Sequence, residues 1–499
     1  MKAKKLILAA VLAVFGNELH AQESATACAK ETLEGSIEAF GGTEVLNSLH
    51  RLKIKALGQR LMREQSERPE GPYIPDYFEI EIEKDLDKNQ LKYSKESKSF
   101  GYNLTFLVND SLVGRDMNHS GRWFPVPGSV ELDIALAPER LLQTALEAKD
   151  LQCEQDSLLQ NIPHRVVSFK HNSKPVKIYI NRNTGLVTAI ETKAEVKSNN
   201  YHIWGDLPVT VYYSMYGLEK NNLIYPRQID IYIDGKASEN ISLLSLEQNP
   251  VFEEELSFPE ASKELLQKYF GRDLSAPLAG DKAIEEAKGL YIIPGSWFTS
   301  IIKQDDGLVI LDAPISSAFS EQLIQFAHEK FPGQKIKAVI NSSGAWPHIG
   351  GLRTFIAEEV PVYHSPLNTG LLEKLAAAEF SNHPDRQQEL QKKLISKPVS
   401  AKTELGKGQN KMQIFPLNAE ASEGMMMVYF PKHKLLYTTD LVQSIDPSAE
   451  PLFREYTLEI LKAIDREQLE VEKIFGMHLP PTELSALKEA LQQQNITVQ

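Results

Sequence analysis

The strongest constraint on the fold is a strand–helix–strand pattern in the second half of the chain. Gly307-Leu-Val-Ile-Leu311 is a short apolar run that ends on Asp312, and Ile336-Lys-Ala-Val-Ile340 is another. The stretch Ser320–Lys330 between them has the spacing of an amphipathic helix. Parallel strands need a crossover of about a dozen residues or more. The pattern therefore predicts a βαβ unit with two parallel, buried strands.

The first half of the chain has a different period. Phe78–Glu83 and Ile229–Asp234 alternate apolar and polar residues, and Asn181–Gly185 separates two apolar runs as a hairpin loop would. These features predict an antiparallel sheet with one solvent-exposed face. Short helices accompany it, one of them over residues 137–149. A chain of 499 residues also exceeds a single hydrophobic core.

The change of period predicts two domains. We expect a signal segment at residues 1–21, an antiparallel β half-barrel-like domain at 22–255, a linker at 256–285 and a second domain at 286–499. Pro259, Pro277 and Gly280 fall in the linker. Its composition indicates an ordered connection rather than a disordered tail.

The first residues have the pattern of a secretory signal peptide. Lysines near the start precede the apolar run Leu6–Phe15, and Leu19-His-Ala21 is an acceptable cleavage site. The run is about half of the ~20 residues that a spanning helix needs. We therefore expect a periplasmic or secreted protein with no transmembrane segment after signal removal. Cys28 and Cys153 are the only cysteines. An oxidising compartment would permit a bridge, but the sequence leaves open whether they meet.

The charge pattern argues against nucleic acid as a partner. The formal net charge is −13, and no run of Lys and Arg is interleaved with aromatic residues. Binding to phosphate backbones requires clustered cationic side chains.

The first half resembles the half-open barrels of periplasmic lipoprotein-carrier proteins. The resemblance rests on a helix that stops at Gly41-Gly42, the strands that follow, and the segment Tyr225–Gly235. It implies a concave sheet face that shelters a lipid or another hydrophobic small molecule. The alternative is that the domain's own helices fill this face, which is the commoner arrangement.

A loop at residues 341–353 follows the second strand of the predicted βαβ unit. Loops at the carboxyl ends of parallel strands hold the sites of open α/β sheets. Here His348-Ile-Gly-Gly351 resembles the end of the metallo-β-lactamase superfamily signature, His-x-His-x-Asp-His followed by x-Gly-Gly. Four further landmarks occur in the family's order, at Gly307–Asp312, Glu423–Pro431, Leu435–Asp440 and Gly476–His478. The resemblance implies an αββα sandwich for residues 286–499.

The resemblance also implies the positions of two metal ions. The ligands of the first ion fall on Ser343, Ala345 and Ala421. A hydroxyl and two methyl groups offer zinc almost no donors.

For the second ion, the signature's Asp falls on Pro347, which supplies no donor, whereas His348, Asp440 and His478 are retained. We therefore expect the dinuclear site to be largely lost, with Ser343, Ala345, Pro347 and Ala421 as vestigial ligand positions.

Three hypotheses for function follow. The preferred one is a non-catalytic binding or scaffolding protein that needs no cofactor, an inactive or weakly active relative of the hydrolases. The alternative is a mononuclear hydrolase of an ester, amide or thioester, with one zinc or iron ion held by His348, Asp440 and His478. The third is a purely structural interaction module.

A few other residues could contribute to a site. Trp297 and Trp346 are expected either at a pocket mouth or in the core. His364 and His383 lie outside the motif positions and are expected at the surface.

Overall fold

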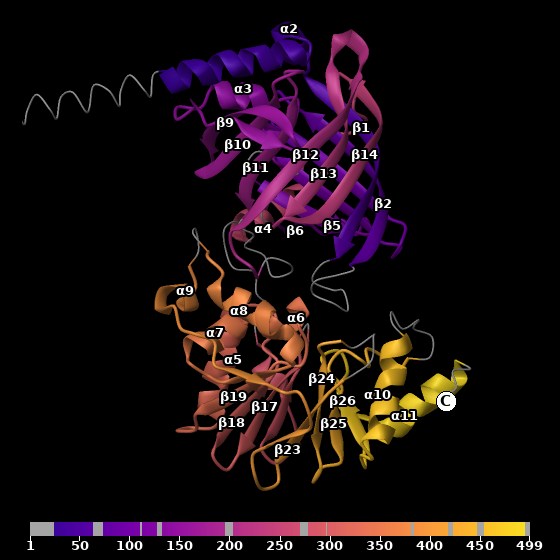
Figure 1. The fold of residues 1–499 in the computed structure, drawn as a ribbon. Coiled ribbons are helices and arrows are strands. Elements are labelled where there is room, and N and C mark those ends of the chain that lie inside the picture. The colour runs from indigo at the N-terminus through magenta and orange to yellow at the C-terminus, as the bar shows by residue number, and fades with distance from the viewer. Residues whose placement is uncertain are drawn as a thin grey trace, which may run out of the picture. The chain divides into compact units, whose positions relative to one another are not determined.

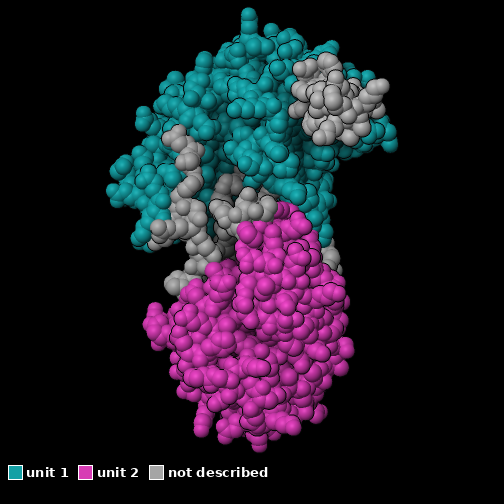
Figure 2. All heavy atoms as spheres, turned by 90° about the vertical axis from the view of Figure 1, so that its left-hand side faces the viewer, with its two compact units in different colours: residues 1–61, 75–194, 207–272 teal, residues 62–74, 195–206, 273–499 magenta. Residues whose placement is uncertain are grey.

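The computed structural model describes residues 24–62, 73–109, 112–126, 132–194, 203–269, 278–295, 297–380, 384–417, 423–446 and 454–494. The predicted signal segment lies outside these ranges. The chain divides into two compact units (Figures 1 and 2), residues 1–61, 75–194 and 207–272, and residues 62–74, 195–206 and 273–499. None of the described helices combines the length and apolar character that crossing a bilayer requires.

Unit 1 contains one large antiparallel sheet, as the alternating segments predict. The strand order is β6-β5-β4-β3-β2-β1-β14-β13-β12-β11-β10-β9-β7, with β8 paired to β9. Its strands are β1 (Arg51–Met62), β2 (Ile74–Asp85), β3 (Gln90–Ser97), β4 (Asn103–Asn109), β5 (Leu112–Met117), β6 (Phe124–Pro125), β7 (Gln152–Cys153), β8 (Ser157–Leu159), β9 (Ile162–His171), β10 (Lys174–Asn181), β11 (Val187–Ala194), β12 (Leu207–Leu218), β13 (Ile224–Ile233) and β14 (Lys236–Gln248).

Short helices pack on one face of this sheet. They are a helix at residues 24–39, α2 (Thr43–Asn47), η2 (Ile134–Leu136) and α3 (Leu141–Leu146). The short helix η3 (Lys220–Asn222) connects β12 and β13, and α4 (Glu260–Tyr269) packs against β5 and β6 in a separate cluster. Leu33 from the helix at 24–39 and Leu142 from α3 share one buried cluster with Ile178 and Val211 from the strands. This packing favours the alternative in which the domain's own helices fill the sheet face.

Two further contacts hold unit 1 together. Cys28, in the helix at 24–39, and Cys153, in β7, form a disulfide bridge across 125 positions of the chain. The first part of the predicted linker packs on the sheet, because Leu256, Phe258 and Leu266 form a buried cluster with Leu107.

Unit 2 contains two mixed sheets. The order of the first is β15-β16-β17-β18-β19-β20-β21 and that of the second is β22-β23-β24-β25-β26-β27. The strands are β15 (Ile284–Ala287), β16 (Leu290–Ile293), β17 (Thr299–Gln304), β18 (Gly307–Leu311), β19 (Ile336–Ile340), β20 (Val362–His364), β21 (Ser396–Pro398), β22 (Thr403–Leu405), β23 (Met412–Pro416), β24 (Met426–Phe430), β25 (Leu435–Tyr437), β26 (Lys473–Phe475) and β27 (Thr482–Glu483).

The predicted βαβ unit is present. β18 and β19 pair in parallel, as do β19 and β20, and α5 connects the first two. The helices of this unit are η4 (Gly280–Lys282), α5 (Ser317–Lys330), α6 (Trp346–Ile349), α7 (Leu352–Ala357), η5 (Pro366–Asn368), α8 (Thr369–Ala377), α9 (Arg386–Leu390), α10 (Arg454–Arg466) and α11 (Leu484–Gln493).

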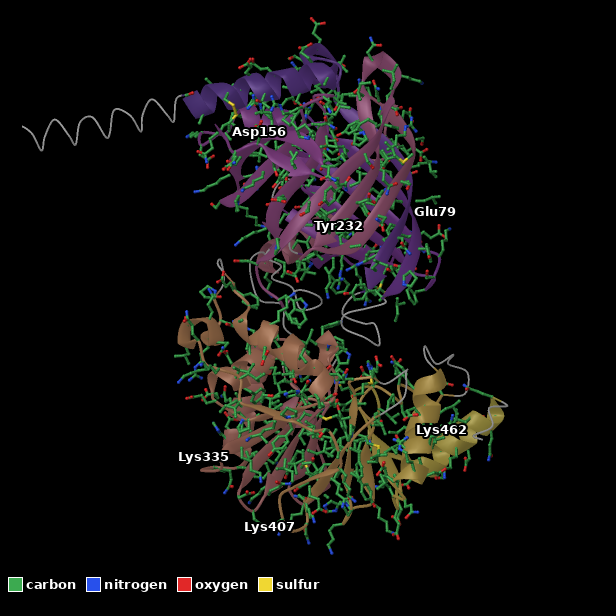
Figure 3. All side chains as sticks on the ribbon, in the orientation of Figure 1. Glu79, Asp156, Tyr232, Lys335, Lys407 and Lys462 are labelled. Carbon is green, nitrogen blue, oxygen red and sulfur yellow. A yellow bond between two sulfur atoms is a disulfide. The ribbon has the colours of Figure 1, made fainter. Side chains whose placement is uncertain are left out.

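One apolar cluster lies between the two sheets of unit 2. It joins Val309 and Ile340 from the first sheet with Val428 and Phe475 from the second. Figure 1 shows α5 to α9 on the side of the first sheet and α10 and α11 on the side of the second. Figure 3 labels Lys335, the residue before β19, at the end of the sheet where that strand begins.

Candidate functional site

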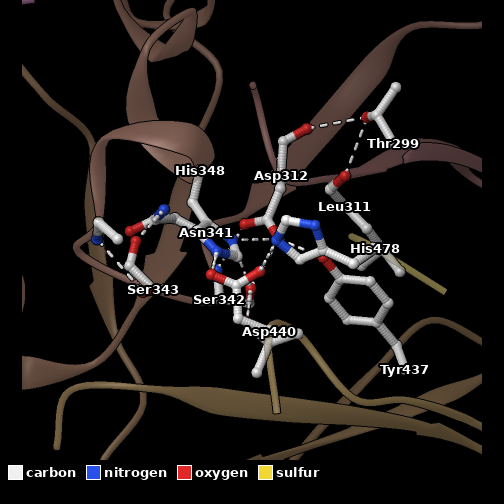
Figure 4. A network of polar contacts seen from close by, with 12 residues as sticks. Thr299, Leu311, Asp312, Asn341, Ser342, Ser343, His348, Tyr437, Asp440 and His478 are labelled. Carbon is white, nitrogen blue, oxygen red and sulfur yellow. Dashed lines mark hydrogen bonds and ion pairs between the residues drawn. The ribbon is translucent and has the colours of Figure 1, made fainter. Parts of the chain in front are cut away.

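The candidate site lies where strands from both sheets of unit 2 end. Asp312 follows β18, Ser342 follows β19, Asp440 follows β25 and His478 follows β26. Figure 4 shows these side chains converging on His348, which is in the short helix α6. The sequence folds this way because each strand is a buried apolar run that is followed by polar residues at the same edge.

His348 is held between two carboxylates. Its Nδ1 lies 2.9 Å from Asp312 Oδ2, and its Nε2 lies 2.7 Å from Asp440 Oδ2. The side chains of His348 and Asp312 are completely buried, and that of Asp440 is 13% exposed. An imidazole that donates from both nitrogens carries both protons and a positive charge.

The electrostatics of the site favour this charged form. Burial alone would lower the pKa of His348, but the charges of Asp440 and Asp312, with the hydrogen bonds to both, outweigh it and raise the pKa to about 10. Burial likewise opposes ionisation of Asp440, yet His348 and then His478 hold its pKa well below the usual range. The electrostatics therefore favour a buried imidazolium at His348, with Asp312 and Asp440 as its hydrogen-bond partners.

Asp312 accepts several hydrogen bonds besides the one from His348. Its Oδ1 accepts from the Ser342 backbone N–H at 2.7 Å, and its Oδ2 accepts from the Ser342 hydroxyl at 2.6 Å and from the Tyr437 hydroxyl. Because Ser342 donates to Asp312, Thr439 Oγ1 donates to Ser342 Oγ, 2.7 Å away. Burial and the Asp312 charge raise the pKa of Tyr437 well above its usual value, so its hydroxyl remains a donor.

The backbone around the site is strained. Asp312, Ile315 and Thr439 have φ values of 56°, 72° and 50°, and two of these residues are β-branched. Such conformations cost about 1–3 kcal/mol each and persist only where the surroundings enforce them. The surrounding structure therefore fixes the backbone conformation of the two loops that hold Asp312 and Asp440.

The Gly350-Gly351 pair explains how the Asp312 loop is held. A Cβ on Gly350 would lie 2.4 Å from the Ile315 carbonyl oxygen, and one on Gly351 would lie 2.5 Å from that of Ser316. The close approach allows the Ala313 N–H to donate to the His348 carbonyl at 3.1 Å and the Gly351 N–H to donate to the Ala313 carbonyl at 2.8 Å. Glycine is needed here because the two backbones touch.

The structure brings together the three residues that were predicted as ligands of a single ion. Asp440 contacts His348 through Oδ2, and its Oδ1 lies 3.3 Å from His478 Nε2. The His478 side chain is 32% exposed. Within the described ranges, however, no group of three or more His, Cys, Asp or Glu side chains has an arrangement that could hold a metal ion.

Three of the four positions predicted to be vestigial ligand positions lie within the described residues. Ser343 is buried, and its hydroxyl accepts from the Ala345 N–H at 3.2 Å. Ala345 precedes α6, and Pro347 lies in its first turn, where the fixed φ of proline is favourable. Ala421 lies outside the described residues.

The donor set does not fit a metal centre as it stands. Both nitrogens of His348 already point at carboxylate oxygens, so a metal could bind Nε2 only after the imidazolium lost a proton. With a pKa of about 10, this loss costs about 4 kcal/mol at pH 7. The positions of the first ion offer only the Ser343 hydroxyl.

Two expectations about other residues can be compared with the structure. His364 was expected at the surface and this is wrong, because it is fully buried between the Ser365 carbonyl and the Ser396 hydroxyl, at 2.8 and 2.7 Å. His383 lies outside the described residues. Trp346 is 2% exposed and packs edge-on against the half-buried Trp297, with ring centroids 4.9 Å apart.

The role of Asp312 was not predicted. In the sequence this residue ends a strand and a family landmark but was not a candidate site residue, although β18 lies beside β19, whose end carries the signature loop. A polar residue at the carboxyl end of the neighbouring parallel strand is the signal that could have revealed it.

Comparison with known proteins gives similarity to solved structures alone. No model of a protein family matches the chain, and no curated protein matches it. The metallo-β-lactamase DIM-1 is 13% identical over 44% of this chain and 98% of its own, with a TM-score of 0.35. The metallo-β-lactamase from Pontibacter korlensis is 16% identical over 43% of this chain and 99% of its own, with a TM-score of 0.33.

A third solved structure of this kind is the inverting sec-alkylsulfatase Pisa1 from Pseudomonas sp. It is 16% identical over 42% of this chain and 40% of its own, with a TM-score of 0.32. Each of these three solved structures matches less than half of this chain.

Proposed function

We propose that this chain is an exported, non-catalytic binding or scaffolding protein whose second unit is an αββα sandwich of the metallo-β-lactamase type. In this unit the dinuclear metal site has been replaced by a proton-bearing network. The disulfide between Cys28 and Cys153 is consistent with an oxidising compartment. Cleavage after Ala21 would be detected by the mass of the mature N-terminal peptide.

One observation carries the proposal. His348 uses both ring nitrogens on Asp312 and Asp440, so the group that a metal-dependent hydrolase would use as a ligand is here a cation. A buried cation between two carboxylates satisfies the charges that a metal ion would otherwise balance. The same contacts hold the ends of β18 and β25 together, which is a structural role.

The test is metal content together with activity. The protein, purified from rich medium without chelators, is expected to contain less than about 0.1 zinc or iron per chain by elemental analysis. It is also expected to hydrolyse ester, amide and thioester probes no faster than the buffer does when either ion is added. The His348→Gln variant should leave both results unchanged.

His364→Gln is the matched control for any loss of metal through misfolding. His364 is also fully buried in unit 2, but its partners are neutral. About one tightly held ion per chain that is lost in His348→Gln and kept in His364→Gln would overturn the proposal.

The runner-up is a mononuclear hydrolase. It is favoured by the convergence of His348, Asp440 and His478, which would hold a single zinc or iron ion that supplies a Lewis acid and an activated water. The cost of removing the His348 proton counts against it. Metal-dependent turnover that is abolished by both His478→Ala and Asp440→Asn would support this function instead.

For unit 1 we propose a scaffolding role rather than carriage of a lipid. The helix at 24–39 and α3 already cover the apolar sheet face, with Leu33 and Leu142 in the same cluster as the strands. Extraction of the purified protein with organic solvent should therefore yield no stoichiometric lipid. One lipid per chain, found by mass spectrometry, would restore the carrier hypothesis.

A further inference from the structure

One row of side chains crosses the outer face of the sheet in unit 1, the face opposite the helices. The strand register pairs Tyr179 with Ala189, Ala189 with Tyr212, and Tyr212 with Asp230. The chain neighbours of these residues lie in the buried cluster under the helices; they are Ile178, Ile190, Val211 and Ile231. Because successive side chains of a strand point to opposite faces, the row itself lies on the outer face.

The row continues across the middle of the sheet. Asp230 pairs with Asn240, and Asn240 pairs with Gln59, whose side-chain N–H donates to the Tyr77 hydroxyl at 3.1 Å. The row therefore crosses β10-β11-β12-β13-β14-β1-β2, which is six strand spacings. At about 4.8 Å per spacing it is about 29 Å long. A ligand that used the whole row would be long, narrow and perpendicular to the strands.

Tyrosine rings form one end of the row. The Tyr179 hydroxyl donates to Glu191 at 2.8 Å, and the ring of Tyr212 meets that of Tyr232 (labelled in Figure 3) edge-on, with centroids 5.4 Å apart. Ala189, between Tyr179 and Tyr212, is fully buried although it lies on the outer face, so its flanking side chains cover its methyl group. All three tyrosines are partly exposed. Their rings are thus held in place and reachable from solvent.

The polar part of the row has its carboxylates already engaged. Asp230 Oδ1 accepts from the side-chain amides of Gln228 and Asn240, both at 2.7 Å. Glu191 accepts from Tyr179, and Lys177 lies opposite it on the next strand. The amide side chains that remain partly exposed are those of Gln59, Gln228 and Asn240. Since amides both donate and accept hydrogen bonds, this surface suits a neutral partner with many hydrogen-bonding groups better than a charged one.

We infer that this row binds an extended, neutral β-1,4-linked glycan that lies across the strands. Pyranose rings place C–H groups against aromatic ring faces, which carry partial negative charge. Their hydroxyl groups donate and accept hydrogen bonds, as the side-chain amides do. The length per sugar of such a glycan is close to the spacing between strands, so successive sugars would meet successive strands. The inference goes beyond the proposed function, because it names a partner for unit 1 and does not depend on the His348 network.

The test is calorimetric titration of the full chain with chitohexaose, a chain of β-1,4-linked N-acetylglucosamine. We expect saturable binding, and binding of the disaccharide chitobiose at least about tenfold weaker, because a disaccharide reaches too few strands. Isomaltohexaose, whose α-1,6 linkages do not hold the chain extended, should not bind. Hexalysine, which represents a basic peptide, should not bind either.

Variants at the two ends of the row locate the site. Tyr212→Leu and Tyr77→Leu should each weaken chitohexaose binding at least about fivefold, whereas Tyr212→Phe, which keeps the ring, should change it by less than about twofold. Tyr77 is 53% exposed, so its replacement gives an answer even if Tyr212→Leu disturbs the sheet. Phe124→Leu is the matched control, because Phe124 is 52% exposed but lies in β6 at the edge of the sheet, outside the row.

Several results would overturn the inference. They are the absence of saturable chitohexaose binding, equal binding of isomaltohexaose, and binding that survives both Tyr212→Leu and Tyr77→Leu. Tighter binding of hexalysine than of chitohexaose would also overturn it and would identify a surface for basic peptides. None of these results bears on metal content, so the proposed function would stand. Stoichiometric zinc with metal-dependent hydrolysis would overturn the proposed function and leave the glycan titration unaffected.

Discussion

The imidazolium of His348 makes a sharp prediction for the pH dependence of stability. Its folded-state pKa of about 10 lies above the ~6.5 of an unfolded histidine. A raised pKa contributes stability that is fully present below about pH 6.5 and is lost as the pH rises through about 10. The contribution of His348 to stability therefore changes between neutral and alkaline pH.

The magnitude follows from proton linkage. Between the two pKa values the folded state binds one more proton than the unfolded state, so the free energy of unfolding falls by about 1.4 kcal/mol per pH unit. Between pH 7 and 9 the His348 contribution should fall by about 2.5 kcal/mol. Thiols do not titrate in this range, because both cysteines are in the disulfide.

The assay measures the free energy of unfolding in urea for wild type and His348→Gln, at half-unit steps from pH 6 to 9.5. Tryptophan fluorescence reports the unfolding. Glutamine leaves two buried carboxylates without a cation, which should lower the stability at pH 7 by about 3–5 kcal/mol. This difference should shrink steadily with rising pH, because only the wild type loses a proton. Groups that titrate equally in both proteins cancel.

His364→Gln provides a control of opposite sign. Burial lowers the pKa of His364, with the Ser365 carbonyl opposing it, so wild type should lose stability through this residue as the pH falls below about 6.5. His364→Gln should therefore remove an acid-side slope and leave the alkaline slope intact. The difference in free energy of unfolding between wild type and His348→Gln could instead stay constant within about 0.5 kcal/mol from pH 7 to 9. That result would refute a charged His348 in the folded protein.

Three further predictions concern stability. In thermal melts, Gly350→Ala should destabilise unit 2 by more than about 3 kcal/mol, because its Cβ would lie 2.4 Å from the Ile315 carbonyl oxygen. The control Gly370→Ala should be neutral or stabilising, because no atom lies within 4 Å of the added Cβ. Cys28→Ser should lower the free energy of unfolding in urea by up to about 5 kcal/mol, because the bridge closes a loop of 125 positions, and added reductant should then have no effect. Tyr437→Phe should cost about 1–3 kcal/mol in urea unfolding, since it removes a donor from Asp312.

Much of the fold could be predicted because the apolar periods are clear. The alternation at residues 229–234 falls in β13 up to Ile233, and the two apolar runs of the βαβ unit are β18 and β19. Long helices were predicted less well. The helix expected at residues 137–149 is reduced to α3, and at the start of the expected helix Pro138 keeps Ala137 in an extended conformation.

The helical segment at residues 346–357 is also interrupted. It divides into α6 and α7 at the Gly350-Gly351 pair. Glycine favours a break there, but the reason for the break is the close approach of the Asp312 loop, which no local pattern shows.

The candidate site was predictable where a motif carried it. His348, Asp440 and His478 converge as their positions in the motif suggest. The contribution of Asp312 was not predictable in the same way, because an aspartate after a strand is also a common turn residue. The charge of His348 depends on both carboxylates at once, and such a coupling between residues 36 and 92 positions apart appears only in three dimensions.

The order of strands in unit 1 has a consequence for biosynthesis. β1 and β14 are neighbours in the middle of the sheet, and they pair Leu52 with Gln248. During translation β1 therefore emerges almost 200 residues before the partner on one of its sides, and closing so long a loop is slow. Until then an unpaired strand edge is open to the wrong partner, so the nascent chain should depend on holdase chaperones more strongly than the finished protein does.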